Sequence, residues 1–170
     1  GMYAVIKEMI DFYSTSDKQH DIGLMFIDLD NFKIYNDTFG HDVGDLILKE
    51  MASIFQNEAI GNGFVSRYGG DEFIIILDTA DDKKLEKIAK NIYAKIESSD
   101  GFKKQIEDYL GHPISVDKDA RITCSMGIAK AGDVKCEEDI NNLIHQADEL
   151  LYKVKTREKG NYAFLDYVLN

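Results

Sequence analysis

Apolar residues in this chain fall into short continuous runs and into helical repeats, and the two patterns predict different elements. The nearly unbroken apolar run over residues 22–29 is typical of a central strand covered on both faces. Strict alternation over 121–129 predicts a strand with one buried face. Shorter runs over 63–68 and 73–77 flank the glycine pair 69–70. They predict a β-hairpin whose turn uses the positive φ that glycine accepts.

Apolar residues spaced three or four positions apart predict helices elsewhere. The predicted helices cover residues 2–13, 32–39, 43–55, 81–96 and 137–155, with a shorter helical stretch over 102–110. Asp42 is expected to cap the third helix, and the segment 98–119 shows no clear period. A last short strand is predicted over 161–169. The order αβααββαβαβ predicts an α+β fold, with a mostly antiparallel sheet covered by helices.

Composition narrows the class of protein. A chain of 170 residues is expected to form one domain with a self-sustaining core. A net charge of −11 argues against a nucleic-acid surface, but it permits a nucleotide substrate if a metal and local lysines offset the repulsion. No apolar stretch approaches 18 residues, so no membrane contact is expected. Cys124 and Cys136 have no metal-binding spacing, which favours a reducing, cytoplasmic location.

Acidic residues follow two of the predicted strands. Asp28 ends the buried strand, and Asp71 with Glu72 follows the glycine turn. If these strands are neighbours, the three carboxylates converge at one edge of the sheet, where Mg²⁺ would bind them together with substrate phosphates. The backbone over 29–33 then starts a helix whose free N–H groups could cradle phosphate, with Lys33 adding charge. The alternative to metal or phosphate binding is that each residue only caps a helix, forms a turn or lies on the surface.

The polar run over 36–45 is the second candidate site. Guanine presents two donors on one edge, so a carboxylate there selects it over adenine. Asp45 is the candidate for that contact, and Asn36 is a companion. The alternative is a helix–turn–helix in which Asp42 or Asp45 acts only as a cap.

Several motifs, taken together and in order, resemble a bacterial GGDEF domain from about residue 22 to 161. They are Ile27-Asp28-Leu29-Asp30-Asn31-Phe32-Lys33, Asn36-Asp37, Phe39-Gly40-His41, Gly44-Asp45, Arg67-Tyr68-Gly69-Gly70-Asp71-Glu72-Phe73, Ser125-Met126-Gly127-Ile128-Ala129 and residues 147–155. The resemblance implies a diguanylate cyclase, which condenses two GTP into cyclic di-GMP and two pyrophosphates. It also implies the palm-like fold of the class III nucleotidyl cyclases, a central sheet ringed by helices.

The resemblance assigns roles to residues at matching positions. Asp28, Asp71 and the Leu29 carbonyl would bind Mg²⁺ or Mn²⁺, and Glu72 would support the metal. Asp71 would accept the proton of the 3′-hydroxyl, and Lys33 would stabilise the transferring phosphate. The substrate-binding residues would be Phe32, Asn36, His41, Asp45, Gly70, Lys155 and Lys159. Arg157 competes with Lys159 for the place of the family arginine.

Departures from the family pattern carry further expectations. Residues 60–63 replace the family's Arg-x-x-Asp, so product inhibition at that site is not expected. The family's opening motif is absent, so the chain is interpreted as a single GGDEF domain over 1–170 cut from a longer protein with an upstream sensory domain. A second GGDEF domain is the expected catalytic partner. The alternative function is a catalytically silent GTP-binding module. A cyclase acting on adenine nucleotides is opposed by Asp45.

Overall fold

The structure is a computed structural model that describes residues 20–157, 160 and 162–164. The helix predicted over 2–13 and most of the strand predicted over 161–169 lie outside these residues. The described elements, in chain order, are β1 (Ile22–Asp30), α2 (Phe32–Phe39), α3 (His41–Ala59), β2 (Gly63–Arg67), β3 (Glu72–Leu77), α4 (Asp82–Ser98), α5 (Lys103–Leu110), a 3₁₀ turn (Lys118–Ala120), β4 (Thr123–Ala131), α6 (Glu137–Arg157) and β5 (Tyr162–Phe164).

The strands form one five-stranded sheet in the order β2-β3-β1-β4-β5. β1 lies at the centre and pairs antiparallel with β3 and with β4. β2 pairs antiparallel with β3, whereas the short β5 runs parallel to β4. The predicted α+β fold with a mostly antiparallel sheet is therefore confirmed.

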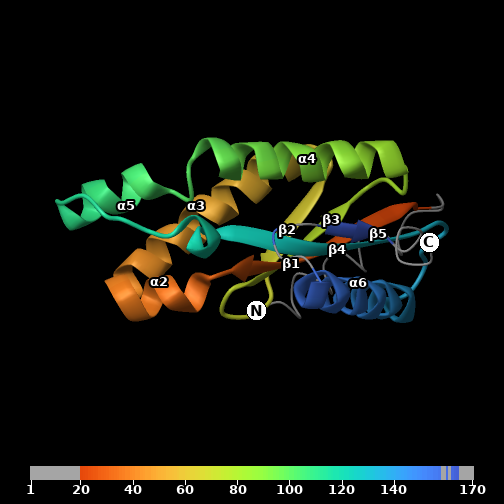
Figure 1. Cartoon of the computed structure of the whole chain (residues 1–170). Coiled ribbons are helices and arrows are strands. Elements are labelled where there is room, and N and C mark those ends of the chain that lie inside the picture. The colour runs from red at the N-terminus through yellow and green to blue at the C-terminus, as the bar shows by residue number, and fades with distance from the viewer. Residues whose placement is uncertain (1–19, 158–159, 161, 165–170) are drawn as a thin grey trace.

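Helices cover both faces of the sheet, α3 and α4 on one and α6 on the other (Figure 1). Alternate residues of β1 serve the two layers, because successive side chains of a strand point to opposite faces. Met25 and Ile27 join the core under α3 and α4. Leu24 and Phe26 join the core under α6. β1 is thus buried on both faces, as its continuous apolar run predicted.

β4 is buried on both faces, so the prediction of a half-buried strand is wrong. Ser125 and Gly127, which were expected on the polar face, are fully covered. A Cβ added to Gly127 would collide with the backbone of α6 at Ala147 and Leu151. Small residues on this face of β4 therefore mark close helix packing rather than exposure to solvent.

The start of α3 also differs from its prediction. Gly40, with φ 95°, is the N-cap residue, and Asp42 lies inside the first turn of the helix. The Asp42 carboxylate instead accepts a hydrogen bond of 2.9 Å from the hydroxyl of Tyr109 in α5. In the described residues, no helix is both long and apolar enough to cross a bilayer.

Candidate functional site

The sheet brings Asp28 and the hairpin carboxylates together at one end of β1. Asp28 is the partner of Glu72 in the antiparallel register of β1 and β3. The next backbone N–H, that of Leu29, donates to the Asp71 carbonyl at 3.1 Å. Residues more than 40 positions apart in the sequence therefore become neighbours through strand pairing.

Asp28 lies in a crowded and poorly solvated position. Burial raises the pKa of its carboxyl, Lys155 partly offsets this rise, and the neighbouring Asp71 raises the pKa further. Its Oδ1 atom is buried and has no hydrogen-bond partner among the described residues. An orphaned carboxylate oxygen beside other acidic groups is the kind of atom that a divalent cation would satisfy.

Glu72 experiences the same environment from the hairpin side. Burial raises the pKa of its carboxyl, and the charges of Asp28, Asp71 and Asp148 raise it further, while Lys155 lowers it. The acidic groups therefore repel one another, and added positive charge at this end of the sheet would relieve the repulsion.

Lys155, near the end of α6, supplies positive charge to this cluster. Its Nζ lies 2.8 Å from Asp28 Oδ2 and 3.3 Å from Asp30 Oδ1. Burial alone would lower the pKa of Lys155, but its hydrogen bonds and ion pairs with Asp28 and Asp30 raise the pKa above its ordinary value. The predicted site residue Lys155 is thus in contact with the predicted metal ligand Asp28.

The cluster is not a complete metal site by itself. Over residues 20–157, no three His, Cys, Asp or Glu side chains converge closely enough to hold an ion. Mg²⁺ normally takes only one or two carboxylates and fills its other positions with water and substrate phosphates. The donor set, with the orphaned Asp28 oxygen, fits an ion that arrives with a nucleotide. The assignment of Asp28, Leu29, Asp71 and Glu72 as its ligands stays a prediction.

The hairpin tip is braced by Arg67. Its guanidinium donates to the carbonyl of Gly70 at 2.6 Å and to that of Gly69 at 3.0 Å. Neither glycine has a positive φ, so the expected reason for the glycine pair is wrong. Gly69 instead packs against the Glu72 side chain, and Gly70 faces open space. These glycines provide room at the tip, which a phosphate would need.

The first turn of α2 follows β1 directly, as predicted. Phe32 and Lys33 occupy this turn, where helix N–H groups lack intrahelical partners. Lys33 is exposed. The preceding Asn31 adopts a left-handed conformation with φ 67°, and its side-chain amide donates to the carbonyl of Arg121 at 2.8 Å. The sharp turn from strand to helix is therefore held by the segment that leads into the neighbouring strand β4.

Asn36 and Asp45 also lie near each other. A Cβ on Gly44 would overlap the side-chain amide of Asn36, so this amide rests on the backbone of α3 one residue before Asp45. Asp45 lines a hollow of about 390 Å³ between α3 and the hairpin. Its wall includes Leu48, Val65, Phe73 and Arg67. An apolar wall with a carboxylate at its rim suits a planar base.

The remaining predicted residues are less closely associated with these groups. His41 is exposed at the first position of α3. Lys159 lies outside the described residues, and Arg157 is the exposed last residue of α6. The placement of Lys159 or Arg157 in the role of the family arginine stays a prediction.

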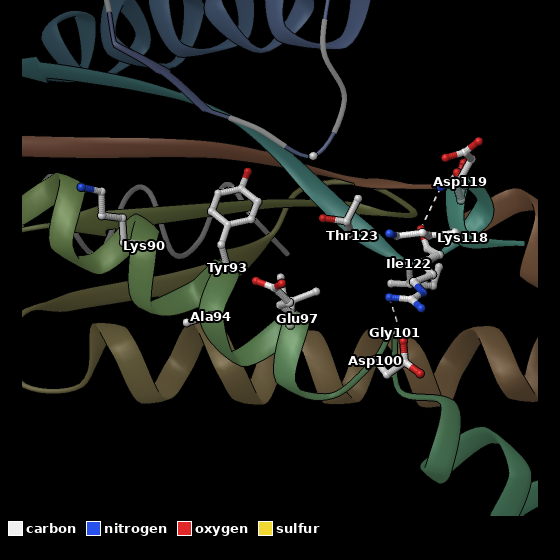
Figure 2. Close-up of a pocket in the computed structure, with 14 residues that line it drawn as sticks. Lys90, Tyr93, Ala94, Glu97, Asp100, Gly101, Lys118, Asp119, Ile122 and Thr123 are labelled. Atoms are coloured by element: carbon white, nitrogen blue, oxygen red, sulfur yellow. Dashed lines mark hydrogen bonds and ion pairs between the residues drawn. The ribbon is translucent and has the colours of Figure 1, made fainter. Parts of the chain in front are cut away.

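A larger hollow of about 740 Å³ lies elsewhere, between α4 and the start of β4 (Figure 2). Three basic and three acidic residues line it, namely Lys90, Lys118, Arg121, Glu97, Asp100 and Asp119. One pair among them, Arg121 and Asp100, forms an ion pair of 3.0 Å. The lining contains none of the carboxylates at the end of β1. The candidate site therefore lies apart from this hollow.

Sequence reasoning missed two buried groups beside the site. Asp30 and Ser125 are 1% and 0% exposed, and the Ser125 hydroxyl donates to both Asp30 oxygens. The spacing of Asp28 and Asp30 was a usable signal, because residues two apart in a strand share a face. Ser125 gave no such signal, since its partner strand was unknown.

The fold and the site together define the class of protein. It is an α+β domain with acidic residues and a lysine gathered at the end of the central strand. A family model described as "Diguanylate cyclase, GGDEF domain" matches residues 6–161. The chain therefore belongs to the GGDEF domain family.

Several curated proteins are similar to this chain. It is 34% identical over 139 residues to diguanylate cyclase DosC of Escherichia coli, a match that spans 82% of the chain and 27% of DosC. It is 29% identical over 162 residues to diguanylate cyclase DgcZ of Escherichia coli, spanning 95% of the chain and 50% of DgcZ. The chain thus spans half or less of the length of these relatives.

Solved structures share the fold. The GGDEF domain of DgcB from Caulobacter crescentus, in complex with c-di-GMP, aligns with a TM-score of 0.72 at 21% identity, covering 97% of this chain and 88% of that one. An EAL/GGDEF domain protein from M. capsulatus aligns with a TM-score of 0.63 at 29% identity, covering 94% of this chain and 92% of that one. The palm-like fold expected from the resemblance is confirmed.

Proposed function

We propose that this domain is a diguanylate cyclase, which condenses two GTP into cyclic di-GMP and releases two pyrophosphates. The observation that carries the proposal is the gathering of Asp28, Asp71 and Glu72 beside Lys155 at the end of β1. Family membership supports the same reaction, because the relatives named above are diguanylate cyclases.

Each group would contribute mainly by position and charge, as in other phosphoryl transfers. Asp28, Asp71, Glu72 and the Leu29 carbonyl would hold Mg²⁺ or Mn²⁺, which supplies positive charge to the phosphates. Asp71 would accept the proton of the attacking 3′-hydroxyl. Lys33, with the N–H groups at the start of α2, would bind phosphate oxygens.

The base would lie in the hollow beside Asp45. Its carboxylate would accept hydrogen bonds from the N1–H and the amino group of guanine, and Asn36 would complete the contact. His41 would line the same pocket, and Gly70 would leave space for the phosphates. Lys155, with Lys159 or Arg157, would reach the terminal phosphates.

One domain holds one GTP in this proposal, so two domains must face each other. The decisive experiment fuses the domain to a parallel leucine zipper, which raises the effective concentration of the second copy. The fused protein, given GTP with Mg²⁺ or Mn²⁺, would form cyclic di-GMP detectable by chromatography. Asp71→Asn would lower the rate by on the order of a hundredfold or more, because a general base typically contributes that much. Asp108→Asn, at an exposed position of α5, is the matched control.

A catalytically silent GTP-binding module is the competing function. The presence of Asp28, Lys33, Asp71 and Glu72 together opposes it, because a module without turnover has no physical need for all four. GTP binding without pyrophosphate release by the zipper fusion would establish the silent module and reject the cyclase. Upstream sensory control is part of the cyclase proposal, and a full-length protein whose output changes with an upstream signal would support it.

A further inference from the structure

Asp30 is a buried carboxylate that the proposed reaction does not use. It lies two residues beyond Asp28 on the same face of β1 and is 1% exposed. Ser125 Oγ donates to its two oxygens at 3.0 and 2.8 Å, and the Gly160 N–H donates to Oδ2 at 3.0 Å. Lys155 Nζ lies 3.3 Å from Oδ1. These contacts use most of the acceptor capacity of an ionised carboxylate.

The two carboxylates that share Lys155 differ in their surroundings. The Asp30 side chain is fully covered, and neutral donors hold both of its oxygens. The Asp28 side chain is 20% exposed, and its second oxygen has no partner among the described residues. Lys155 therefore has one enclosed partner and one partner that an incoming ligand can reach.

We propose that Asp30 is a positioning residue that tethers Lys155, so that the lysine can exchange Asp28 for a nucleotide phosphate without leaving the site. The inference rests on the proposed binding of GTP at the end of β1. A ligand that carries phosphates and a divalent cation offers Asp28 a new partner. It offers Lys155 a new partner as well, and the contact with Asp30 keeps the ammonium group in reach of both.

A purely structural role for Asp30 would not require its charge. Ser125 and Gly160 are neutral donors, so a neutral acceptor would serve to fix the chain that follows α6. A buried carboxylate is costly unless a cation compensates it, and the Lys155 ammonium lies 3.3 Å from Asp30. Asp30 and Lys155 therefore act as a unit, and the same carboxylate fixes both Lys155 and Gly160, five residues further along.

The tether can be tested first without any substitution. Acetic anhydride acetylates free lysine amines, and mass spectrometry gives the rate at each site. Lys153, exposed on the same helix, is the matched reference. We expect Lys155 to react on the order of tenfold or more slowly than Lys153, because its amine is held against Asp28 and Asp30 and is less accessible to the reagent. Equal rates would overturn the tether, whether or not the protein binds GTP.

A double-mutant cycle tests the link to the phosphates. Asp30→Asn should weaken GTP binding on the order of tenfold and leave GMP binding unchanged, because GMP lacks the terminal phosphates. In a Lys155→Met background, Asp30→Asn should have almost no further effect on GTP binding. Asp82→Asn, which breaks the distant surface ion pair between Asp82 and Lys130, is the control.

The outcomes separate the tether from the proposed function. Equal loss of GTP and GMP binding, or full additivity with Lys155→Met, would overturn the tether. A wild-type protein that binds no GTP would refute the proposed function, and equal acetylation rates of Lys155 and Lys153 would still overturn the tether. If Asp30→Asn does not fold, the acetylation rate of Lys155 in an Asp28→Asn variant decides the matter. Slow reaction there supports the tether, because Asp30 is then the charged carboxylate that still contacts Lys155, and a rate equal to that of Lys153 overturns it.

Discussion

The side-chain amide of Asn36 occupies the space that a Cβ on Gly44 would fill. Asn36 belongs to α2 and Gly44 to α3, so this contact sets how closely the two helices approach. It also holds the amide beside Asp45, the carboxylate proposed to select guanine. A glycine inside a helix is normally unfavourable, and here close approach explains it.

Gly44→Ala should therefore weaken nucleotide selectivity. The new methyl group would displace Asn36, and the affinity for GTP would fall on the order of tenfold while the weak affinity for ATP stays the same. The free energy of unfolding would change little, because alanine favours a helix by about 1 kcal/mol over glycine and offsets part of the clash. Competition binding with a fluorescent GTP analogue measures both affinities.

Ser53→Ala, an exposed change in the same helix, serves as the control for that experiment. If Gly44→Ala binds GTP as tightly as the wild type, the Asn36 contact does not shape the base pocket.

Glu72→Gln should stabilise the metal-free protein at neutral pH. The pKa of Glu72 is raised in the folded state, so the native protein binds more protons than the unfolded chain as the pH passes between the two pKa values. The stability that this group contributes is present below the unfolded pKa and is lost as the pH rises through the folded pKa. Glutamine removes the ionised form, so the melting temperature should be higher than that of the wild type at pH 7.

The same comparison at pH 4 should show a smaller difference, since the wild-type carboxyl is then more protonated. Calorimetry at both pH values in the presence of a chelator gives the result. Glu97→Gln, at an exposed position in α4, controls for the change in net charge. A lower melting temperature for Glu72→Gln at pH 7 would refute the repulsion described above.

The two cysteines should differ sharply in reactivity. Cys124 is fully buried in β4, and burial raises the pKa of its thiol to about 12. Cys136 is exposed. Because the thiolate is the reactive form, Ellman's reagent should titrate one thiol in the native protein and both in denaturant. Cys136→Ser should abolish the native reaction, and rapid native reaction of that variant would contradict the burial of Cys124.

Gly127→Ala should be far more destabilising than Gly70→Ala. A methyl group on Gly127 would meet the backbone of α6, which cannot move aside as a side chain can. The free energy of unfolding should fall by about 3 kcal/mol. Gly70 has nothing within 4 Å of the added Cβ and no positive φ, so its substitution should be nearly neutral. Urea denaturation of the two variants gives the comparison, and similar losses would contradict it.

The sequence predicted the elements that its hydrophobic spacing marks strongly. β1 and α6 were recognisable because one is a continuous apolar run and the other repeats every three or four residues. α5 was hard to define for a physical reason. Its N-cap residue, Phe102, has φ 62° and makes no side-chain capping bond. The sequence therefore has no capping residue that would mark the start of this helix.

The candidate site was predictable only in part. Asp28, Asp71 and Glu72 could be suspected from their places after strands, but their contact depends on β1 pairing with β3. The exposure of Ser125 was misjudged, because a small polar residue in a strand can equally face solvent or a buried carboxylate. Which of the two it faces depends on the element that packs against the strand, and the local sequence does not show which element that is.

The alternation of β1 has a consequence for the shape of any ligand. Asp28 projects to the face of the sheet that carries Lys155. Asp45 lies on α3, which covers the opposite face, where Phe73 is buried. A molecule that contacts both Asp45 and Lys155 must bend around the end of β1, from one face of the sheet to the other. Only a ligand long enough to reach both faces can therefore contact both residues. An isolated base or a free pyrophosphate could occupy only one side of the strand end.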